Sequence, residues 1–359
     1  MIPPAQWPRC YALVDMDAFY VSVELLRRPE LRGLPVVVAG SGPRAVVTTA
    51  SYEARRFGVH SATPASRARR LCPQAVFVAP DFDHYRSCSA QVMGLLRDHF
   101  ETVEVMGLDE AYVDLSGLER PRASAKRARA EILSTCGLNC SVGIGPNKLI
   151  AKVASDLEKP NGFVLLDQDA ARARLGPLPA AVIPGIGPKT VQRLGALGIE
   201  TVAQVGGAEE ERLIAAFGPR LGPHLRALGR LEDRRELDTA RLRKSESRET
   251  TFDHDLRGVE ALDAPLRDLA RRLCGDMAAR GARGQTVGIK VRLDDFSTHT
   301  RARTLPSPTA DYVMVLEVAR ELLLAFDPPR PVRLLGVRVA GLDQQVRELD
   351  ATPQLELTI

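Results

Sequence analysis

Three carboxylates stand within segments that otherwise read as hydrophobic strands. Asp15 follows the apolar run 11–14, and Asp109 and Glu110 interrupt the alternating segment 102–117. A buried strand rarely tolerates a carboxylate unless a cation compensates its charge. Hard divalent ions such as Mg²⁺ bind carboxylate and phosphate oxygens, and a pair of them can catalyse phosphoryl transfer. The spacing alone leaves a plainer alternative equally open, in which the carboxylates pair with nearby arginines at strand edges or turns.

The segments around these residues predict one α+β unit. Apolar runs and alternation predict strands, Gly and Pro clusters predict turns, and amphipathic stretches predict helices. The expected strands lie at 11–14, at 34–40, within 44–59, within 102–117 and at 139–147. The expected helices lie at 19–26, 120–135 and 148–159. This unit has to position the three carboxylates.

The second half of the chain changes character twice. Short helices punctuated by Gly and Pro run from about 168 to 230, and a charged stretch from 229 to 249 has the composition of a tether. Helices at 260–280 and 309–325 then alternate with strands at 285–295 and 332–340. The fold class expected from the whole pattern is α+β, divided into several domains.

The composition narrows the class of protein. The chain has 359 residues, 45% hydrophobic and 26% charged, which favours a globular protein of more than one domain. A net charge of +4 is too small to identify an anionic partner. Six scattered cysteines without zinc-site spacing favour a reduced, cytoplasmic protein. Neither a secretory leader nor an apolar run of membrane-spanning length is found, so no membrane partner is expected.

Five motifs follow one another along the chain. They are VDMDAFYVSVE (14–24), SYEARRFGV (51–59), GLDEAYVDLSG (107–117), SVGIGPNKLIAKVASDLEKPNG (141–162) and PGIGPKT (184–190). Together they closely resemble the Y-family DNA polymerases, above all the bacterial DinB, or polymerase IV, branch. The resemblance continues through 288–306 and 332–342, and so covers nearly the whole chain. One departure is Gly107-Leu108, where the family commonly has Ser-Ile before the acidic pair.

The resemblance implies a right-hand polymerase, with palm, fingers and thumb, and a C-terminal little-finger domain of the α+β class. The implied domains are a palm at 1–24 and 82–166, fingers at 25–81, a thumb with a helix-hairpin-helix at 167–230, a linker at 231–243, a little finger at 244–345 and a tail at 346–359.

Carried over by position, Asp15 and Asp109 resemble the metal-bridging aspartates, and Glu110 resembles the ligand of the catalytic metal beside the primer 3′-oxygen. The main-chain carbonyl of Met16 would complete the nucleotide-side metal site. The implied cofactor is a pair of Mg²⁺ ions, with Mn²⁺ as an alternative. Asp17 matches the second aspartate of the opening motif, for which a structural role is equally open.

The resemblance also implies contacts with the incoming nucleotide. The residues matching triphosphate contacts are Phe19, Tyr20, Tyr52, Arg55 and Lys159. Tyr20 further matches the steric gate, a bulky residue whose ring would collide with a ribose 2′-hydroxyl and so favour deoxynucleotides. The alternative is that Tyr20 is only a core aromatic behind Asp17.

A third group of residues resembles DNA contacts. They are Gly185, Gly187 and Lys189 in the helix-hairpin-helix turn, Lys148 and Lys152 on one helix face, and Arg301 and Arg303 in the implied little finger. Backbone amides at a glycine-rich helix start can meet a phosphate without reading sequence. For the two lysines, a solvated helix face is the plainer alternative.

The terminal segment QLELTI resembles the peptide by which many family members dock on the sliding clamp. Gln354, Leu355 and Leu357 match that peptide, but Thr358 replaces its aromatic anchor. A free tail is the alternative.

The implied function is template-directed addition of dNTPs to a primer 3′ end, with low fidelity, translesion synthesis and no proofreading. The implied partners are primer–template DNA, dNTPs and the sliding clamp, and the implied enzyme is a monomer. One alternative is a catalytically silent DNA-binding accessory protein of the same fold, which would have no physical need for three buried carboxylates. Another is a metal-dependent nuclease or cyclase with a similar palm, which leaves the helix-hairpin-helix and terminal domain unexplained.

Overall fold

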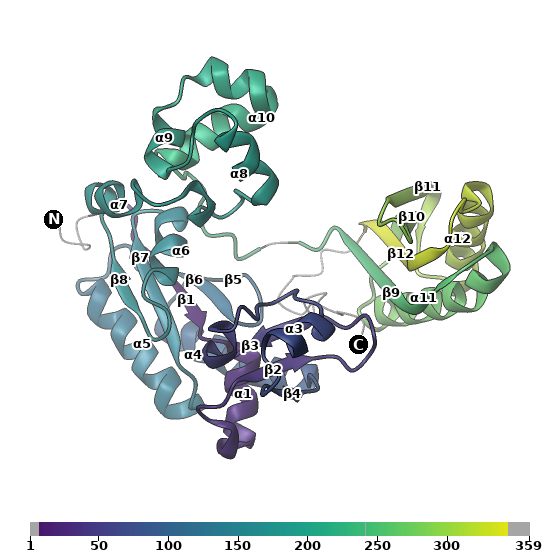
Figure 1. The fold of residues 1–359 in the computed structure, drawn as a ribbon, viewed down its shortest axis with the longest axis horizontal. Helices are drawn as coiled ribbons and strands as arrows, with labels where there is room; N and C mark the ends of the chain where they lie inside the picture. The colour runs from purple at the N-terminus through teal and green to yellow at the C-terminus, as the bar shows by residue number, and fades with distance from the viewer. Residues whose placement is uncertain (1–6, 241, 344–359) are drawn as a thin grey trace. The chain divides into compact units, whose positions relative to one another are not determined.

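The computed structural model describes residues 7–240 and 242–343, whose helices and strands are drawn in Figure 1. The described residues divide into two compact units: unit 1 comprises 7–32 and 81–239, and unit 2 comprises 33–80, 240 and 242–343. Each unit contains both helices and strands, so the expected α+β class is confirmed. The boundaries between palm, fingers, thumb and little finger stay predictions.

Unit 1 is built on a five-stranded sheet in the order β5-β6-β1-β7-β8. Its strands are β1 (Tyr11–Met16), β5 (Val103–Val105), β6 (Glu110–Asp114), β7 (Cys140–Gly145) and β8 (Phe163–Leu165). The central strand β1 is buried along its whole length and runs antiparallel to both neighbours. Its register places Asp15 opposite Glu110 on one side and opposite Ser141 on the other.

Helix α6 (Lys148–Asp156) covers the face of the sheet that carries Asp15. The side chain of Asn147 caps the helix by accepting a backbone amide at 2.9 Å. A Cβ built on Gly143 of β7 would lie 2.1 Å from the carbonyl oxygen of Ala151, so only glycine permits this close crossing. Gly143 pairs with Leu13, and residues two apart on a strand share a face, which brings α6 over Asp15.

Two other helices of this unit lie close to their predicted ranges, namely α1 (Phe19–Arg27) and α5 (Pro121–Cys136). Helix α4 (Phe82–His99), for which no range was predicted, packs against α5. A short 3₁₀ turn at Pro29–Leu31 follows α1.

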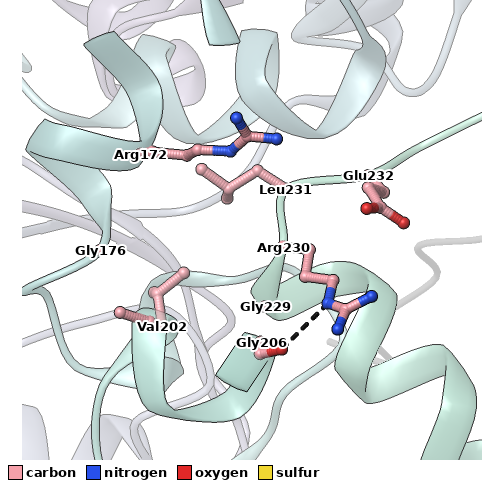
Figure 2. Close-up of a pocket in the computed structure, with 9 residues that line it drawn as sticks. Arg172, Gly176, Val202, Gly206, Gly229, Arg230, Leu231 and Glu232 are labelled. Carbon is pink, nitrogen blue, oxygen red and sulfur yellow. Dashed lines mark hydrogen bonds between the residues drawn. The ribbon is translucent and has the colours of Figure 1, made fainter. Parts of the chain in front are cut away.

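A helical module follows in unit 1, as expected from the Gly- and Pro-punctuated sequence. It contains α7 (Gln168–Leu175), a 3₁₀ turn at Ala180–Val182, α8 (Pro188–Gly195), α9 (Val202–Gly207) and α10 (Glu210–Gly229). Backbones cross closely here, since a Cβ on Gly229 would lie 2.3 Å from the amide nitrogen of Gly206. A cavity of about 430 Å³ lies beside this crossing, and Figure 2 shows residues that line it. None of the residues singled out from the sequence is among them.

The charged segment after α10 is not a free tether at its start. Leu237 packs against Leu13 and Tyr112 of the central sheet. The backbone amide of Asp238 donates to Glu104 Oε2 at 3.1 Å. Residues 231–238, here called the strap, are therefore held on unit 1.

Unit 2 contains two sheets. The smaller one has the order β3-β2-β4, and the larger one has the order β11-β10-β12-β9. The smaller sheet comprises β2 (Val36–Ala39), β3 (Val47–Ala50) and β4 (Val76–Val78), together with α2 (Tyr52–Arg55) and α3 (Ala65–Leu71). The larger sheet packs one apolar face on α11 (Val259–Ala279) and α12 (Tyr312–Phe326).

Two strands of the larger sheet correct the sequence-based prediction. The central strands β10 (Gly284–Leu293) and β12 (Val332–Leu342) were expected, whereas β9 (Ser245–Leu256) and β11 (Thr298–Thr309) were not. Both unexpected strands lie at the edges of the sheet and are rich in polar residues; β11 is mostly exposed, whereas most residues of β9 are half-buried. They lack the apolar run of a buried strand, so the tether predicted as far as 249 ends earlier, where β9 begins.

All six cysteines are free thiols. Within residues 7–240 and 242–343, no helix has both the length and the apolar character that crossing a membrane requires.

Candidate active site

Asp15, Asp109 and Glu110 meet at one end of the two central strands. Asp15 and Glu110 are direct partners across the β1–β6 ladder, so their side chains share a face of the sheet. Asp109 immediately precedes β6, and its carbonyl oxygen accepts a hydrogen bond from the Met16 amide at 2.8 Å. The sheet register therefore gathers three carboxylates that the sequence places on separate segments.

Two lysines supply cations to these carboxylates. Lys152 Nζ lies 2.8 Å from both Asp15 Oδ2 and Glu110 Oε2, and so bridges them. Lys159 Nζ lies 2.7 Å from the same oxygen of Asp15. Any other cation that binds Asp15 would therefore compete with these two ammonium groups.

The ionisable groups at this site change one another's pKa. Solvent reaches Asp109, but the protein around its carboxyl group removes part of the hydration shell; this loss raises its pKa to about 6, and the charges of Asp15 and Glu110 add to the rise. Burial alone would lower the pKa of Lys152, but attraction to Asp15 and Glu110 outweighs burial and raises that pKa. The pKa of Lys159 is raised in the same way, chiefly by Asp15. Both lysines are therefore charged at neutral pH.

The donor set fits a hard divalent cation. The side chains that converge here offer carboxylate oxygens, and ammonium groups already stand where positive charge is needed. Among the residues that the structure describes, no group of three or more His, Cys, Asp or Glu side chains is already assembled as a set of metal ligands. In this arrangement the lysines hold the carboxylate oxygens.

Comparison with known proteins identifies the family. Residues 14–156 match the impB/mucB/samB family, and residues 243–357 match the C-terminal domain of the same family. A DNA polymerase IV of Streptomyces coelicolor is 43% identical over 341 residues, covering 93% of this chain and 71% of the relative. A DNA polymerase IV of Methanoculleus marisnigri is 42% identical over 337 residues, covering 92% of this chain and 93% of the relative. The chain belongs to the Y-family DNA polymerases, in the polymerase IV branch.

Solved structures agree with this assignment. A Y-family DNA polymerase chimera of Dbh and Dpo4 superposes with a TM-score of 0.83 at 26% identity, covering 93% of this chain and 99% of the other. An insertion ternary complex of Dbh DNA polymerase has the same identity and coverage, with a TM-score of 0.67. The predicted Y-family fold and the predicted class of enzyme, a DNA-directed translesion DNA polymerase, are confirmed.

Tyr20 of this Y-family polymerase lies beside Phe19 in the first turn of α1. Its ring stacks on Tyr85 at a centroid distance of 4.6 Å and meets Phe82 edge-on at 5.8 Å. Burial raises the pKa of Tyr20 to about 12, and the negative charge of Asp109 adds to the rise. Tyr20 is thus a packed aromatic residue whose pKa also responds to the charge of the acidic site. Its role as steric gate stays a prediction.

Lys148 corrects the expectation of a solvated helix face. Its side chain is buried, and Nζ pairs with the equally buried Glu104 at 2.5 Å, above the Tyr112 ring. A buried and paired ammonium is not available to a DNA phosphate in this arrangement. Lys148 instead links α6 to β5 and, through Glu104, to Asp238 of the strap.

Tyr52 and Arg55 lie on the short helix α2 of unit 2. The Arg55 guanidinium lies 4.5 Å from the centre of the Tyr52 ring, and its Nε donates to the carbonyl oxygen of Ala50 at 3.0 Å. The two side chains are thereby held together at the end of β3. Their contact with a triphosphate stays a prediction.

The helix-hairpin-helix turn has an exposed backbone. Gly185 has a φ of +93°, in the region that favours glycine, and Gly187 directly precedes α8. Ile186 between them is buried and anchors the turn, whereas Lys189 is exposed in the first turn of α8. This geometry suits a phosphate contact through the main chain, which stays a prediction.

The two little-finger arginines differ in their surroundings. Arg301 lies over the Phe326 ring at 4.9 Å, while Arg303 forms an ion pair with Glu321. Both are exposed on the edge strand β11. The predicted clamp-binding residues Gln354, Leu355 and Leu357 lie outside the described residues.

Sequence reasoning missed the contact of Lys152 with the carboxylates. The spacing of Lys148 and Lys152 indicated a shared helix face but not which surface that face meets. Gly143 is the residue that could have signalled it, because a glycine within a strand pattern indicates close approach of another backbone.

We expect Lys152→Met to lower the thermal unfolding temperature of the metal-free protein by about 2 °C, because Asp15 and Glu110 lose a shared counter-charge. Added MgCl₂ should then raise the unfolding temperature more in the variant than in the wild type. Lys126→Met, on the exposed face of α5, is the control. An equal response to MgCl₂ in all three proteins would show that Lys152 does not compete with the metal.

Gly107 stands beside Asp109, since a Cβ built on it would lie 3.4 Å from Asp109 Oδ1. We expect Gly107→Ser to add a hydroxyl donor there and to move the pKa of Asp109 from about 6 back toward its ordinary value. Carbon-13 NMR titration of the aspartate carboxyls measures this shift. Gly107→Ala adds the same Cβ without a donor, and an equal shift in both variants would rule out the hydrogen bond.

Proposed function

We propose that this polymerase extends a primer 3′ end with dNTPs, using Asp15, Asp109 and Glu110 to hold two Mg²⁺ ions, with the Met16 carbonyl completing one site. The observation that supports it is the convergence of the three carboxylates at one end of β1 and β6, with two lysines as counter-charges. Mn²⁺ is an alternative ion for the same oxygen donors.

The bound ions would ease ionisation of the primer 3′-hydroxyl and balance the charge of the leaving pyrophosphate. The chain itself neutralises and positions. If the carboxylates held metal ions, Asp15 would no longer be available to Lys152 and Lys159, and both ammonium groups could then meet phosphates of the primer and the nucleotide. Both lysines are half-buried beside the acidic site, so their charges would stay close to the reacting atoms, where a fixed positive charge stabilises developing negative charge better than mobile water does.

The nucleotide contacts are proposed from the motif resemblance. Tyr52, Arg55 and Lys159 would bind the triphosphate, as would the backbone amides at Phe19 and Tyr20. These two residues occupy the first turn of α1, where helix amides lack intrahelical acceptors. A phenol and cations are suited to a highly charged phosphate group.

The DNA contacts are proposed from the motif resemblance and from the exposure of the groups concerned. They comprise the amides at Gly185 and Gly187, together with the side chains of Lys189, Arg301 and Arg303. Binding through phosphates should weaken as salt rises, because condensed counterions are released. We further propose a monomeric, cytoplasmic enzyme with low fidelity and no proofreading.

Primer extension tests the proposal directly. Purified protein, a labelled primer on a longer template, dNTPs and MgCl₂ should give template-dependent extension that EDTA abolishes. A template carrying an abasic site or a bulky adduct tests bypass in the same assay. Specific DNA binding without extension, under varied metal and salt, would instead support a catalytically silent accessory protein.

The clamp contact has its own test. We expect deletion of 353–359 to leave extension by the polymerase alone unchanged but to remove its stimulation by a sliding clamp, because Leu355 and Leu357 would supply the apolar anchors. Stimulation that survives the deletion would contradict docking through this peptide.

A further inference from the structure

We propose that Asp17 is a positioning residue, which aims Lys159 by holding the turn at 159–162. The sequence left the role of Asp17 open beside the metal ligand Asp15. The inference rests on the proposed function in one respect, that Lys159 contacts the nucleotide triphosphate.

Asp17 is buried just beyond the end of β1, with 4% of its surface exposed. Each of its carboxylate oxygens accepts a hydrogen bond. Ser141 Oγ donates to Oδ1 at 2.8 Å, and the backbone amide of Asn161 donates to Oδ2 at 2.7 Å. Ser141 Oγ in turn accepts the amide of Gly162 at 3.1 Å. Two successive backbone amides of the turn therefore donate hydrogen bonds, one to Asp17 and the other to the serine that Asp17 orients.

A residue of α5 also holds the turn. Arg129 of α5 donates to the carbonyl oxygens of Asn161 and Gly162, at 2.8 and 3.4 Å, and to the side-chain oxygen of Asn161. Asn161 has a φ of +63°, a left-handed conformation that asparagine adopts more readily than most other residues with a side chain. Asp17 accepts the amide of this residue and Arg129 donates to its carbonyl group, so both fix the same backbone.

The turn carries Lys159 into the acidic site. Lys159 is its first residue, and its Nζ reaches both Asp15 Oδ2 and Asp156 Oδ1 at 2.7 Å. The end of β1 therefore fixes Lys159 at two points. Asp15 pairs with its ammonium group, and Asp17 accepts a hydrogen bond from the backbone of the turn to which Lys159 belongs. The packing is tight, because a Cβ on Gly162 would lie 2.7 Å from the carbonyl oxygen of Glu158. A shift of the turn would therefore move Lys159 with it.

Asp17→Asn tests the inference in the full-length protein. The change keeps the shape of the side chain but turns one acceptor oxygen into an NH₂ group that faces a donor. Ser141→Ala removes the hydroxyl that accepts the Gly162 amide, and Arg129→Ala removes the side chain that holds the carbonyl groups of the turn. Arg129 is half-buried, so folding tolerates the change. The controls are Ser89→Ala, another buried serine, and Arg127→Ala, an exposed arginine of the same helix. Thermal unfolding verifies that each variant is folded.

The readouts are steady-state single-nucleotide incorporation and its Mg²⁺ dependence. We expect Asp17→Asn, Ser141→Ala and Arg129→Ala to raise KM for the dNTP about five- to tenfold, with a smaller change in kcat. The Mg²⁺ concentration for half-maximal rate should not change. In a Lys159→Ala background the same substitutions should have little further effect, because they act through that lysine.

The outcomes separate the possible roles. A higher Mg²⁺ requirement in Asp17→Asn would assign Asp17 to the metal site and overturn the proposal. Effects that add fully to those of Lys159→Ala, or that match the controls, would also overturn it. If Lys159→Ala alone leaves KM unchanged, the proposed triphosphate contact of Lys159 fails instead, and the positioning of the turn then remains measurable as higher amide exchange at Asn161 and Gly162 in Asp17→Asn.

Discussion

Asp109→Asn should reduce primer extension at least about a thousandfold, while leaving the protein folded. Asparagine has the shape of aspartate but lacks the charge that would hold two divalent ions beside Asp15 and Glu110. Single-turnover extension with excess enzyme, at several Mg²⁺ concentrations, measures the loss. Extension at the wild-type rate would contradict the proposed role of Asp109.

The same substitution should stabilise the metal-free protein. Because the folded protein raises the pKa of Asp109 to about 6, the ionised carboxylate destabilises the fold. This penalty is absent below about pH 4, grows as pH rises to about 6 and is constant above it. Asp109→Asn removes the penalty, so at pH 7 we expect an unfolding temperature higher by about 2 °C, after discounting for solvent screening.

Asp98→Asn is the control for this gain, since Asp98 is an exposed aspartate on α4. The difference in unfolding temperature between Asp109→Asn and the wild type should shrink from pH 7 to pH 4. A difference that does not depend on pH would show that electrostatic crowding is not its cause.

Tyr20→Ala should lower discrimination against ribonucleotides by about a hundredfold. A ring that blocks the 2′-hydroxyl imposes a steric penalty of roughly 3 kcal/mol, and alanine removes it. Competing incorporation of dCTP and rCTP opposite the same template base measures the ratio of kcat/KM. Tyr20→Phe keeps the ring and should keep the discrimination.

Stability must be measured beside discrimination, because Tyr20 is also packed against Tyr85 and Phe82. Truncation of a packed aromatic costs about 3 kcal/mol whether or not it has a role in selectivity. Phe82→Ala disturbs the same aromatic cluster from a neighbouring position and serves as the matched control. If both variants lose stability and neither admits ribonucleotides, Tyr20 is a core residue and the steric gate is wrong.

The parts of the site that could be predicted are those governed by local patterns. Apolar runs and alternation located β1 and β6, so Asp15 was placed at the end of a buried strand, and Asp109 and Glu110 within an alternating segment, before their pairing was known. The amphipathic segment 148–159, which Pro160 and Gly162 end, located α6. The edge strands β9 and β11 were not predicted because they are rich in polar residues and have no clear apolar period.

The partners of each charge could not be predicted from spacing. Lys148 and Lys152 lie one helical turn apart, yet one is buried against Glu104 and the other bridges Asp15 and Glu110. Which carboxylate each lysine meets depends on how α6 crosses the sheet, and that crossing is set by the missing side chain of Gly143. Asp17 likewise gains its role from Asn161, a residue distant in sequence.

The strap shortens the free linker between α10 and β9. A linker that was free from 231 to 243 would span up to about 45 Å when extended. Asp238 is instead held by Glu104, and Lys244 is held in the β9–β12 sheet by the Gly341 amide, so the chain between them reaches at most roughly 20 Å. Because fewer residues are free, we expect ordering of this linker to cost less conformational entropy when the polymerase binds DNA.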